Sequence, residues 1–203
     1  MARPRVTAKT KIMRIEIVLA ETQPVVRRVV EVPDDASLAV LHGVVQDVMG
    51  WEHSHLHEFE INAARYGLPD PDVDPEFDTE TLDEAMVTLA QVLTVGDRFD
   101  YVYDFGDNWR HHLTVEAVTA PSAGVRYPRC VAGEGACPPE DVGGVGGYER
   151  FLEILADPSD PEHGEQVGWW GSDRFDPARF DLDETNDELK GLAWTALRRR
   201  STR

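Results

Sequence analysis

Apolar and charged positions alternate near the start of the chain and predict a β-hairpin there. In Lys11–Ala20 the apolar side chains Ile15 and Ile17 alternate with charged residues, and a period of two residues is typical of a half-buried strand. The segment Val25–Val32 is rich in valine, a β-branched residue that favours strands, so we expect it to be the partner strand.

The spacing of apolar residues then changes to that of a helix. Leu38, Leu41 and Val48 lie at helical intervals, which place them on one face. Ser37 can accept a hydrogen bond from a free amide of the first turn, and Gly50 can end the helix in a left-handed conformation. The sequence therefore predicts one well-defined helix between these two residues.

Short elements are expected on both sides of an acidic segment. His57, Phe59 and Ile61 share one face of a further strand, because side chains alternate across a strand. Asp70–Glu84 contains eight carboxylates and no basic residue. It lacks the turn glycine and the final glutamate of a calcium loop, so we expect a solvated acidic loop. Met86–Thr88 is expected to be a short strand that leads into a short helix.

A second hairpin is predicted for Phe99–Val118, around the turn YDFGDNW. Its first strand presents Phe99, Tyr101, Tyr103 and Phe105 on one face, and its second presents Trp109, His111, Leu113 and Val115. Aspartate, glycine and asparagine in the centre of this segment favour a tight turn.

Together these elements predict an α+β fold. A hairpin followed by a helix that crosses to a further strand is the ubiquitin-like β-grasp arrangement, a mixed sheet with one main helix on one face. We expect this core over residues 10–120, closed by the second hairpin. Residues 121–203 are expected to form a loop and helical extension packed on the core in one integrated domain, with helices at Tyr148–Ala156 and Asp183–Arg200. The pair Trp169-Trp170 is expected at the seam between the two parts.

The excess of negative charge changes the range of possible partners. The chain has 38 acidic residues against 20 lysines and arginines, a net charge of −18, which repels phosphate, so we expect no nucleic-acid partner. No apolar run is long enough to span a membrane, and no apolar stretch follows the charged N-terminal segment. We therefore expect no membrane partner, no signal peptide and a cytoplasmic location.

The two cysteines, Cys130 and Cys137, lie in a segment rich in glycine and proline. A structural disulfide is not expected in a reducing compartment, and two thiolates alone cannot complete a tetrahedral zinc site. Ordinary thiols, half of a metal site and a redox pair remain as alternatives.

Polar residues that can carry chemistry gather around the turn of the second hairpin. Asp104, Asp107 and His112 combine carboxylates with an imidazole, which are ligand types suited to a divalent metal or to acid–base work. His55 and His57 could approach them from a neighbouring strand. The structural alternative is that the aspartates only satisfy the amides of the turn.

A second polar group precedes a glycine-rich segment. Glu140 and Asp141 stand before GGVGG, but no strand precedes this loop and no lysine follows it, so neither a P-loop nor a dinucleotide motif is present. We expect either a flexible turn or a pair of carboxylates that faces the hairpin turn and completes a polar pocket. The resulting candidate binding surface comprises His55, His57, Tyr103, Asp104, Asp107, Trp109, His112, Glu140 and Asp141.

Three stretches of the chain resemble one family. WEHSHLHEFEI, YVYDFGDNWRHHLTVE and CVAGEGACPPEDVGGVGGYERFL, followed by W-x-G and DP-x-x-F-D…N-x-x-L, resemble the plasmid pRiA4b ORF-3-like family from about Lys11 to Leu192. The resemblance implies a bacterial or archaeal protein that is often met on plasmids and mobile elements, and it supplies no mechanism. The matching motif positions are His55, His57, Tyr103, Asp104, Gly106, Asp107, Trp109, His112, Pro138, Pro139, Glu140, Asp141, Gly143, Gly144 and Tyr148.

The resemblance leaves two functional hypotheses. The first is a binding module that takes a peptide, protein or small molecule on the surface made by YDFGDNW and CPPEDVGG, or at an open sheet edge. The alternative is a metal-assisted hydrolase in which carboxylates and His112 gather around one divalent ion. Some relatives carry a resolvase label, but this chain lacks the serine among arginines and the basic helix-turn-helix of a serine recombinase, so we do not expect that activity.

Overall fold

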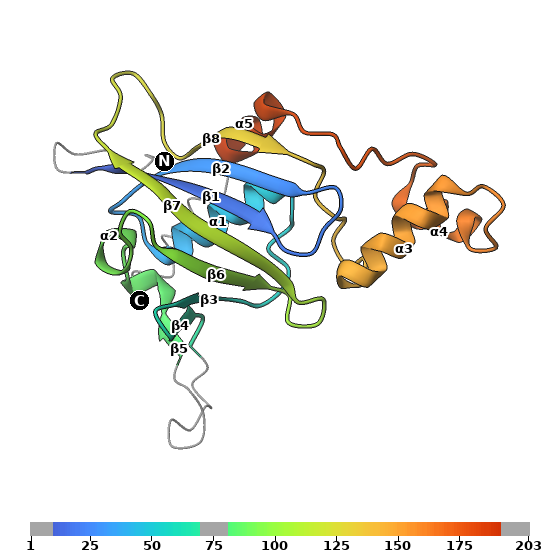
Figure 1. Ribbon diagram of the computed structural model, residues 1–203, viewed down its shortest axis with the longest axis horizontal. Helices are drawn as coiled ribbons and strands as arrows, with labels where there is room; N and C mark the ends of the chain where they lie inside the picture. Colours follow the sequence, from blue (N-terminus) through green and yellow to red (C-terminus); the bar gives the residue numbers. More distant parts are fainter. Residues whose placement is uncertain (1–9, 70–80, 192–203) are drawn as a thin grey trace, which may run out of the picture.

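A single sheet of eight strands forms the centre of the computed structural model, which describes residues 10–69 and 81–191 (Figure 1). The strands are β1 (Ile12–Leu19), β2 (Val26–Pro33), β3 (His57–Ile61), β4 (Ala64–Gly67), β5 (Thr81–Asp83), β6 (Arg98–Tyr103), β7 (Trp109–Thr119) and β8 (Arg129–Glu134). Their order across the sheet is β5-β4-β3-β6-β7-β1-β2-β8. Only β4 and β5 pair in parallel among these neighbours, so the sheet is mixed but mainly antiparallel.

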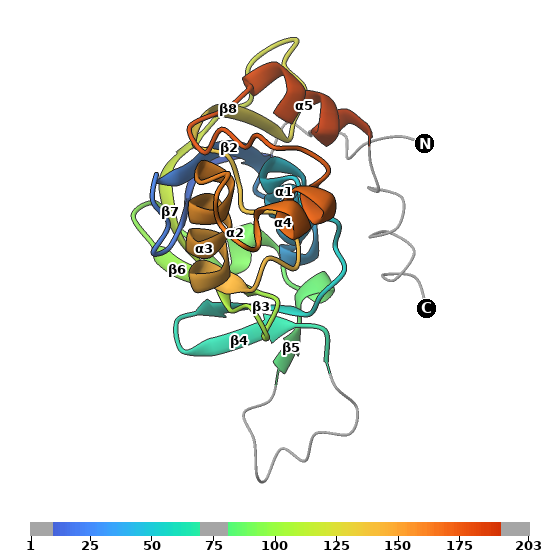
Figure 2. The ribbon, with the colours of Figure 1, turned by 90° about the vertical axis from the view of Figure 1, so that its right-hand side faces the viewer.

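The helices cover one face of the sheet and extend past its end. They are α1 (Leu38–Met49), the 3-10 helix η1 (Glu84–Met86), α2 (Leu89–Val92), α3 (Gly144–Ala156), α4 (His163–Trp170) and α5 (Leu182–Gly191). Helix α1 crosses behind the sheet in Figure 1, whereas α3 and α4 project beyond the ends of the strands. Helix α5 lies beside β8 and α1, as Figure 2 also shows.

The main core lies between α1 and the sheet, as the apolar spacing predicts. Ile15 and Ile17 of β1 are fully buried, as is Leu41 of α1. Ser37 caps the start of α1 by accepting from the Val40 amide, and Gly50 ends the helix with a φ of 83°. The first hairpin and its helix are therefore confirmed, with boundaries that follow from the capping residues.

An α+β fold is confirmed, but the β-grasp core is not. The expected core ends near residue 120, yet the sheet continues through β8, in a segment expected to be loop. The edge of β8 is closed by a side chain of α5, because Asn186 Oδ1 accepts from the Cys130 amide and Asn186 Nδ2 donates to the Cys130 carbonyl, both at 3.0 Å. This pair of hydrogen bonds blocks strand addition at that point of the edge.

Several local predictions need correction. Helix α3 begins at Gly144, four residues earlier than expected, so most of GGVGG is helical. Met86–Thr88 does not form a strand, because Met86 ends η1 and Thr88 makes only an isolated bridge with Ser37. Phe105 lies in the hairpin turn with 53% of its surface exposed, rather than on the buried face.

The predicted tryptophan seam also differs. Trp169 and Trp170 both contact Phe151, and Trp170 also contacts Phe175, so both pack within the extension itself and stay partly exposed. The first part of the acidic segment and the end of the last predicted helix lie outside the described residues.

The sheet face opposite α1 carries paired charges instead of a second apolar layer. Arg110 reaches both Glu60 and Asp100, at 2.8 and 2.6 Å, and Arg14 reaches Glu116 at 3.0 Å. Among the described residues, no helix has the length and apolar character needed to cross a membrane.

Candidate functional site

The turn between β6 and β7 is shaped by its own aspartate. Asp104 adopts a left-handed backbone conformation with a φ of 54°, which aspartate tolerates better than most residues. Its Oδ1 accepts from the Gly106 amide at 2.9 Å, as in an Asx turn. Its Oδ2 remains directed toward His55, 3.6 Å away. The aspartate therefore satisfies the turn with one oxygen and faces the site with the other.

The loop of residues 137–143, which we call the CPPED loop, lies against this turn. The two segments are far apart in the sequence, since Asp107 and Gly143, which bond to each other, are separated by 36 residues. Asp107 Oδ2 accepts from the Gly143 amide at 3.0 Å. Trp51 Nε1 donates to the Pro138 carbonyl at 3.0 Å, which fixes the other end of the loop. Of the two alternatives for this loop, the structure therefore shows the second, in which its carboxylates face the hairpin turn.

Tyr103 and Glu140 form the inner part of this junction. The Tyr103 hydroxyl donates to Glu140 Oε1 at 2.5 Å and accepts from the Ser54 amide at 3.1 Å. Glu140 Oε2 accepts from the Glu52 amide at 3.0 Å. Burial, and then the neighbouring Glu140 carboxylate, raise the pKa of Tyr103, so the hydroxyl keeps its proton and continues to donate.

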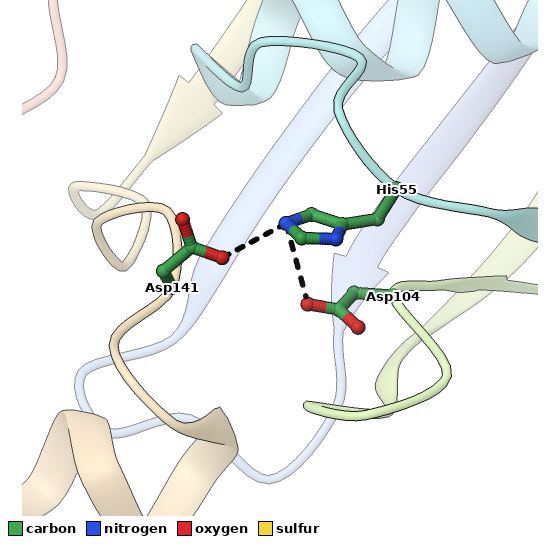
Figure 3. Close-up of side chains that lie close together, drawn as sticks. All are labelled: His55, Asp104 and Asp141. Atoms are coloured by element: carbon green, nitrogen blue, oxygen red, sulfur yellow. Dashed lines mark hydrogen bonds and ion pairs between the residues drawn. The ribbon is translucent and has the colours of Figure 1, made fainter.

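His55 lies at the centre of the site, as Figure 3 shows. Its Nε2 is 2.9 Å from Asp141 Oδ1, and 3.6 Å from both Asp104 Oδ2 and Glu140 Oε1. The Asp104 side chain is 14% exposed and that of Asp141 is 67% exposed. We call these four residues the His55 cluster; it is shielded on the Asp104 side and open to solvent at Asp141.

Two predicted site histidines lie elsewhere. His57 points into the protein, where its Nε2 is 2.9 Å from Glu84 Oε2 and its ring stacks on that of His42 at 3.4 Å. His112 points to the exposed sheet face, where its Nδ1 is 2.8 Å from Asp100 Oδ1. The structure therefore does not bring the proposed ligands Asp104, Asp107 and His112 together; Asp104 meets His55 and Asp141 instead.

The aromatic members of the candidate surface, Tyr103 and Trp109, are buried beneath the site. Trp109 is 1% exposed, and the Trp51 ring stacks on Tyr103 with centroids 5.0 Å apart. These rings are core residues that hold the junction and offer no open face for ligand stacking.

Sequence reasoning missed the role of Glu84, which it placed in a solvated acidic loop. Glu84 is 3% exposed because it begins η1 and turns inward to His57. The sequence does contain a signal for this position, namely the apolar residues at helical spacing that follow it. They form the short helix α2, which Thr88 caps and buried Leu89 begins, and this helix holds the preceding segment against the core.

The two cysteines are free thiols in this structure. Burial raises the pKa of both Cys130 and Cys137, so both stay protonated near neutral pH and are poor nucleophiles. Their surroundings favour the first of the three alternatives, ordinary thiols.

Gly144 offers a test of the contact between the turn and α3. Its φ is 68°, and a Cβ there would lie 2.7 Å from the Asp107 carbonyl oxygen. We expect Gly144→Ala to lower the free energy of unfolding by about 2 kcal/mol, because backbone strain and a main-chain clash combine. The matched control is Gly146→Ala, where a Cβ meets nothing within 4 Å; helix propensity predicts a gain of about 0.5–1 kcal/mol. Urea unfolding measures both, and equal stability of the two variants would contradict the predicted clash.

Comparisons with known proteins agree with this architecture. The sequence matches the family described as "Plasmid pRiA4b ORF-3-like protein" over residues 11–184. It is 38% identical over 195 residues to "Uncharacterized protein y4hQ" of Sinorhizobium fredii, an alignment that covers 94% of this chain and 98% of that protein. The crystal structure titled "Protein of Unknown Function MM3350" from Methanosarcina mazei Go1 is similar with a TM-score of 0.77 and 34% identity, over 86% of this chain and 96% of that one. The chain belongs to the plasmid pRiA4b ORF-3-like protein family.

Proposed function

We propose that the protein is a binding module whose ligand-binding surface joins the β6–β7 turn to the CPPED loop and takes a ligand with a positively charged group. One observation carries this proposal: three segments far apart in the sequence supply a histidine and three carboxylates that converge at the His55 cluster. Residues that only satisfy a turn would not need partners from the other two segments.

The electrostatics of the cluster favour a cationic ligand. Two like charges 4 Å apart near a protein surface repel by about 4 kcal/mol, and the chain as a whole already carries a net charge of −18. A positive group placed among Asp104, Glu140 and Asp141 would relieve this repulsion, whereas an anion would increase it. The surface is thus unsuited to phosphate or to nucleic acid.

Two carboxylates of the cluster are also held in place, which supports binding. Glu140 has both carboxylate oxygens fixed, by the Tyr103 hydroxyl and by the Glu52 amide. Asp104 is fixed by the Gly106 amide. A site whose groups are already held in place loses little side-chain entropy when a ligand arrives.

The test uses three cationic probes, namely a lysine-containing peptide, spermidine and a divalent metal ion, titrated into ¹⁵N-labelled protein. We expect at least one probe to shift the amide signals of the turn and the CPPED loop. The double variant Asp104→Asn, Asp141→Asn should weaken that probe at least about 10-fold, the effect of losing 1.4 kcal/mol of attraction. Asparagine retains the left-handed turn, so the variant should fold.

His112→Ala is the matched control, since it removes an exposed histidine that also faces a carboxylate, Asp100. It should bind the probe as the native chain does. If none of the three probes binds, or if the double variant binds equally well, the proposed surface is not a cation-binding site and the cluster is architectural.

A metal-assisted hydrolase is the second candidate. It is favoured by the combination of an imidazole with exposed Asp141, because a metal held there would keep positions open to water and substrate. Substrate turnover, which a binding module lacks, separates the two candidates.

A further inference from the structure

We propose that the His55 cluster is a binding site for one first-row divalent metal ion, with His55 Nε2 and one oxygen each of Asp104 and Asp141 as its ligands. This inference rests on the proposed function and names the chemical class of its ligand. The three residues each offer a ligand atom, and these atoms all lie within 4.8 Å of one another.

The spacing of these atoms suits a small metal ion. Bonds of about 2.0–2.1 Å in a tetrahedral site place neighbouring ligand atoms roughly 3.3 Å apart. His55 Nε2 is 3.6 Å from Asp104 Oδ2 and 2.9 Å from Asp141 Oδ1, so both separations lie within a few tenths of an ångström of that value. Asp141 is the most exposed of the three side chains and can make the remaining adjustment by rotating.

The donor types narrow the choice of metal. Calcium and magnesium prefer sites made of oxygen atoms alone, whereas an imidazole together with carboxylates suits zinc, iron and manganese. The absence of a thiolate from this set disfavours copper(I). Zinc is therefore the probe of choice, because it does not change oxidation state during a titration.

The three ligands lie on separate segments, and a different hydrogen bond holds each segment in place. His55 precedes β3, and its amide donates toward the Tyr103 hydroxyl at 3.4 Å. Asp104 is anchored through Oδ1 to the Gly106 amide, which leaves Oδ2 for the metal. Asp141 follows the loop segment that Trp51 holds at Pro138. Figure 3 shows the three side chains pointing toward one another from these separate segments.

Glu140 has a different part in this site. Both of its oxygens accept hydrogen bonds, from Tyr103 and from the Glu52 amide, although Oε1 lies 3.6 Å from His55 Nε2. We assign it as a positioning residue that adds negative charge next to the metal and is not itself a ligand. Three protein ligands then leave at least one coordination position open, as in zinc sites that bind a water or a ligand atom.

Isothermal titration of the full-length protein with Zn²⁺ alone tests the site. We expect one ion per chain in the native protein. His55→Ala and Asp141→Asn should each weaken binding by at least about 10-fold, since the first removes the imidazole ligand and the second replaces a charged carboxylate ligand by a weaker neutral amide oxygen. Asp141→Asn alters an exposed side chain, so its result does not depend on tolerance of a buried change. Glu140→Gln should weaken Zn²⁺ by about 10-fold, the lower end of the range for outer-sphere partners.

Two other histidine–carboxylate pairs are matched controls. His112→Ala disrupts the pair with Asp100, and His53→Ala disrupts the pair with Asp47, which is 3.2 Å away. Both variants should bind Zn²⁺ like the native chain. A stoichiometry near zero would overturn the inference, as would equal losses in the His55 and His112 variants, which would indicate non-specific binding to surface histidines.

The outcome also separates this inference from the proposed function. If Zn²⁺ fails to bind while spermidine or the lysine-containing peptide shifts the amides of the turn and the CPPED loop, the metal site is wrong and the cation-binding surface stands. If Zn²⁺ and the organic cations all fail, both proposals fall.

Discussion

Replacement of Arg28 by alanine is expected to lower the free energy of unfolding by about 3 kcal/mol or more, because hydrogen bonds to charged groups are each worth about 1.5–3 kcal/mol. Arg28 is 4% exposed. Its Nε donates to the Val48 carbonyl near the end of α1, and a terminal nitrogen donates to the Glu134 carbonyl at the end of β8, both at 2.8 Å. The guanidinium also lies 4.6 Å from the centre of the Phe180 ring. One side chain thus connects α1, β8 and the segment before α5, and its loss would leave carbonyls in this region without their donor.

The neighbouring arginine provides the control. Arg27 points to the opposite face of β2, where it pairs with Glu16 and is 30% exposed. An exposed ion pair contributes about 1 kcal/mol or less, so Arg27→Ala should have a small effect. Chemical denaturation of both variants measures the difference, and comparable losses for the two arginines would show that burial of Arg28 is not what stabilises this corner.

Replacement of Glu84 by alanine is expected to cost about 3–5 kcal/mol, the usual result of removing one partner of a buried pair. The side chains of Glu84 and His57 are 4% and 5% exposed, and their polar atoms are 2.9 Å apart. Behind His57, the His42 ring stacks in parallel and places its Nδ1 2.7 Å from the Tyr101 hydroxyl. Without Glu84, the Nε2 atom of His57 would remain buried without a hydrogen-bond partner.

Glu60→Ala is the control for this prediction. Glu60 also pairs with a basic residue of the sheet, Arg110, but on the exposed face with 34% of its side chain accessible. Its removal should cost about 1 kcal/mol or less. Urea denaturation distinguishes the two cases; if Glu84→Ala is tolerated as well as Glu60→Ala, the Glu84–His57 pair contributes no more than a surface contact. Glu84→Gln, which keeps a hydrogen-bonding group, should show a smaller loss than alanine.

Three histidine–carboxylate contacts therefore have different roles in this protein. The pair of His57 with Glu84 is buried and stabilises the fold, and the pair of His112 with Asp100 lies on the exposed sheet face. Among the described residues, His55 alone meets several carboxylates from separate segments at an accessible position. Burial and the number of converging segments, rather than residue type, distinguish the candidate functional group from the structural ones.

The sequence by itself determined the local elements. The two-residue period predicted β1 and, apart from Phe105, the buried faces of the second hairpin, and Ser37 and Gly50 predicted both ends of α1. It also predicted the family, and it identified the YDFGDNW turn and the CPPED loop as parts of one candidate surface, which stays a prediction. These features depend on side-chain alternation, capping and turn chemistry, which act over a few residues and can therefore be read from the sequence.

Only the tertiary structure decided the strand order, the place of β8 and the pairing of each histidine. Cys130 lies in a strand because β2 and Asn186 satisfy its backbone, although its own segment is rich in turn-forming residues. His55 meets Asp104 and Asp141 because the segment before β3, the turn from β6 to β7 and the loop before α3 meet at the same corner of the molecule. Such contacts join residues far apart in the chain, and their free energy comes from packing and hydrogen bonding across the whole sheet, for which no short stretch of sequence carries a signature.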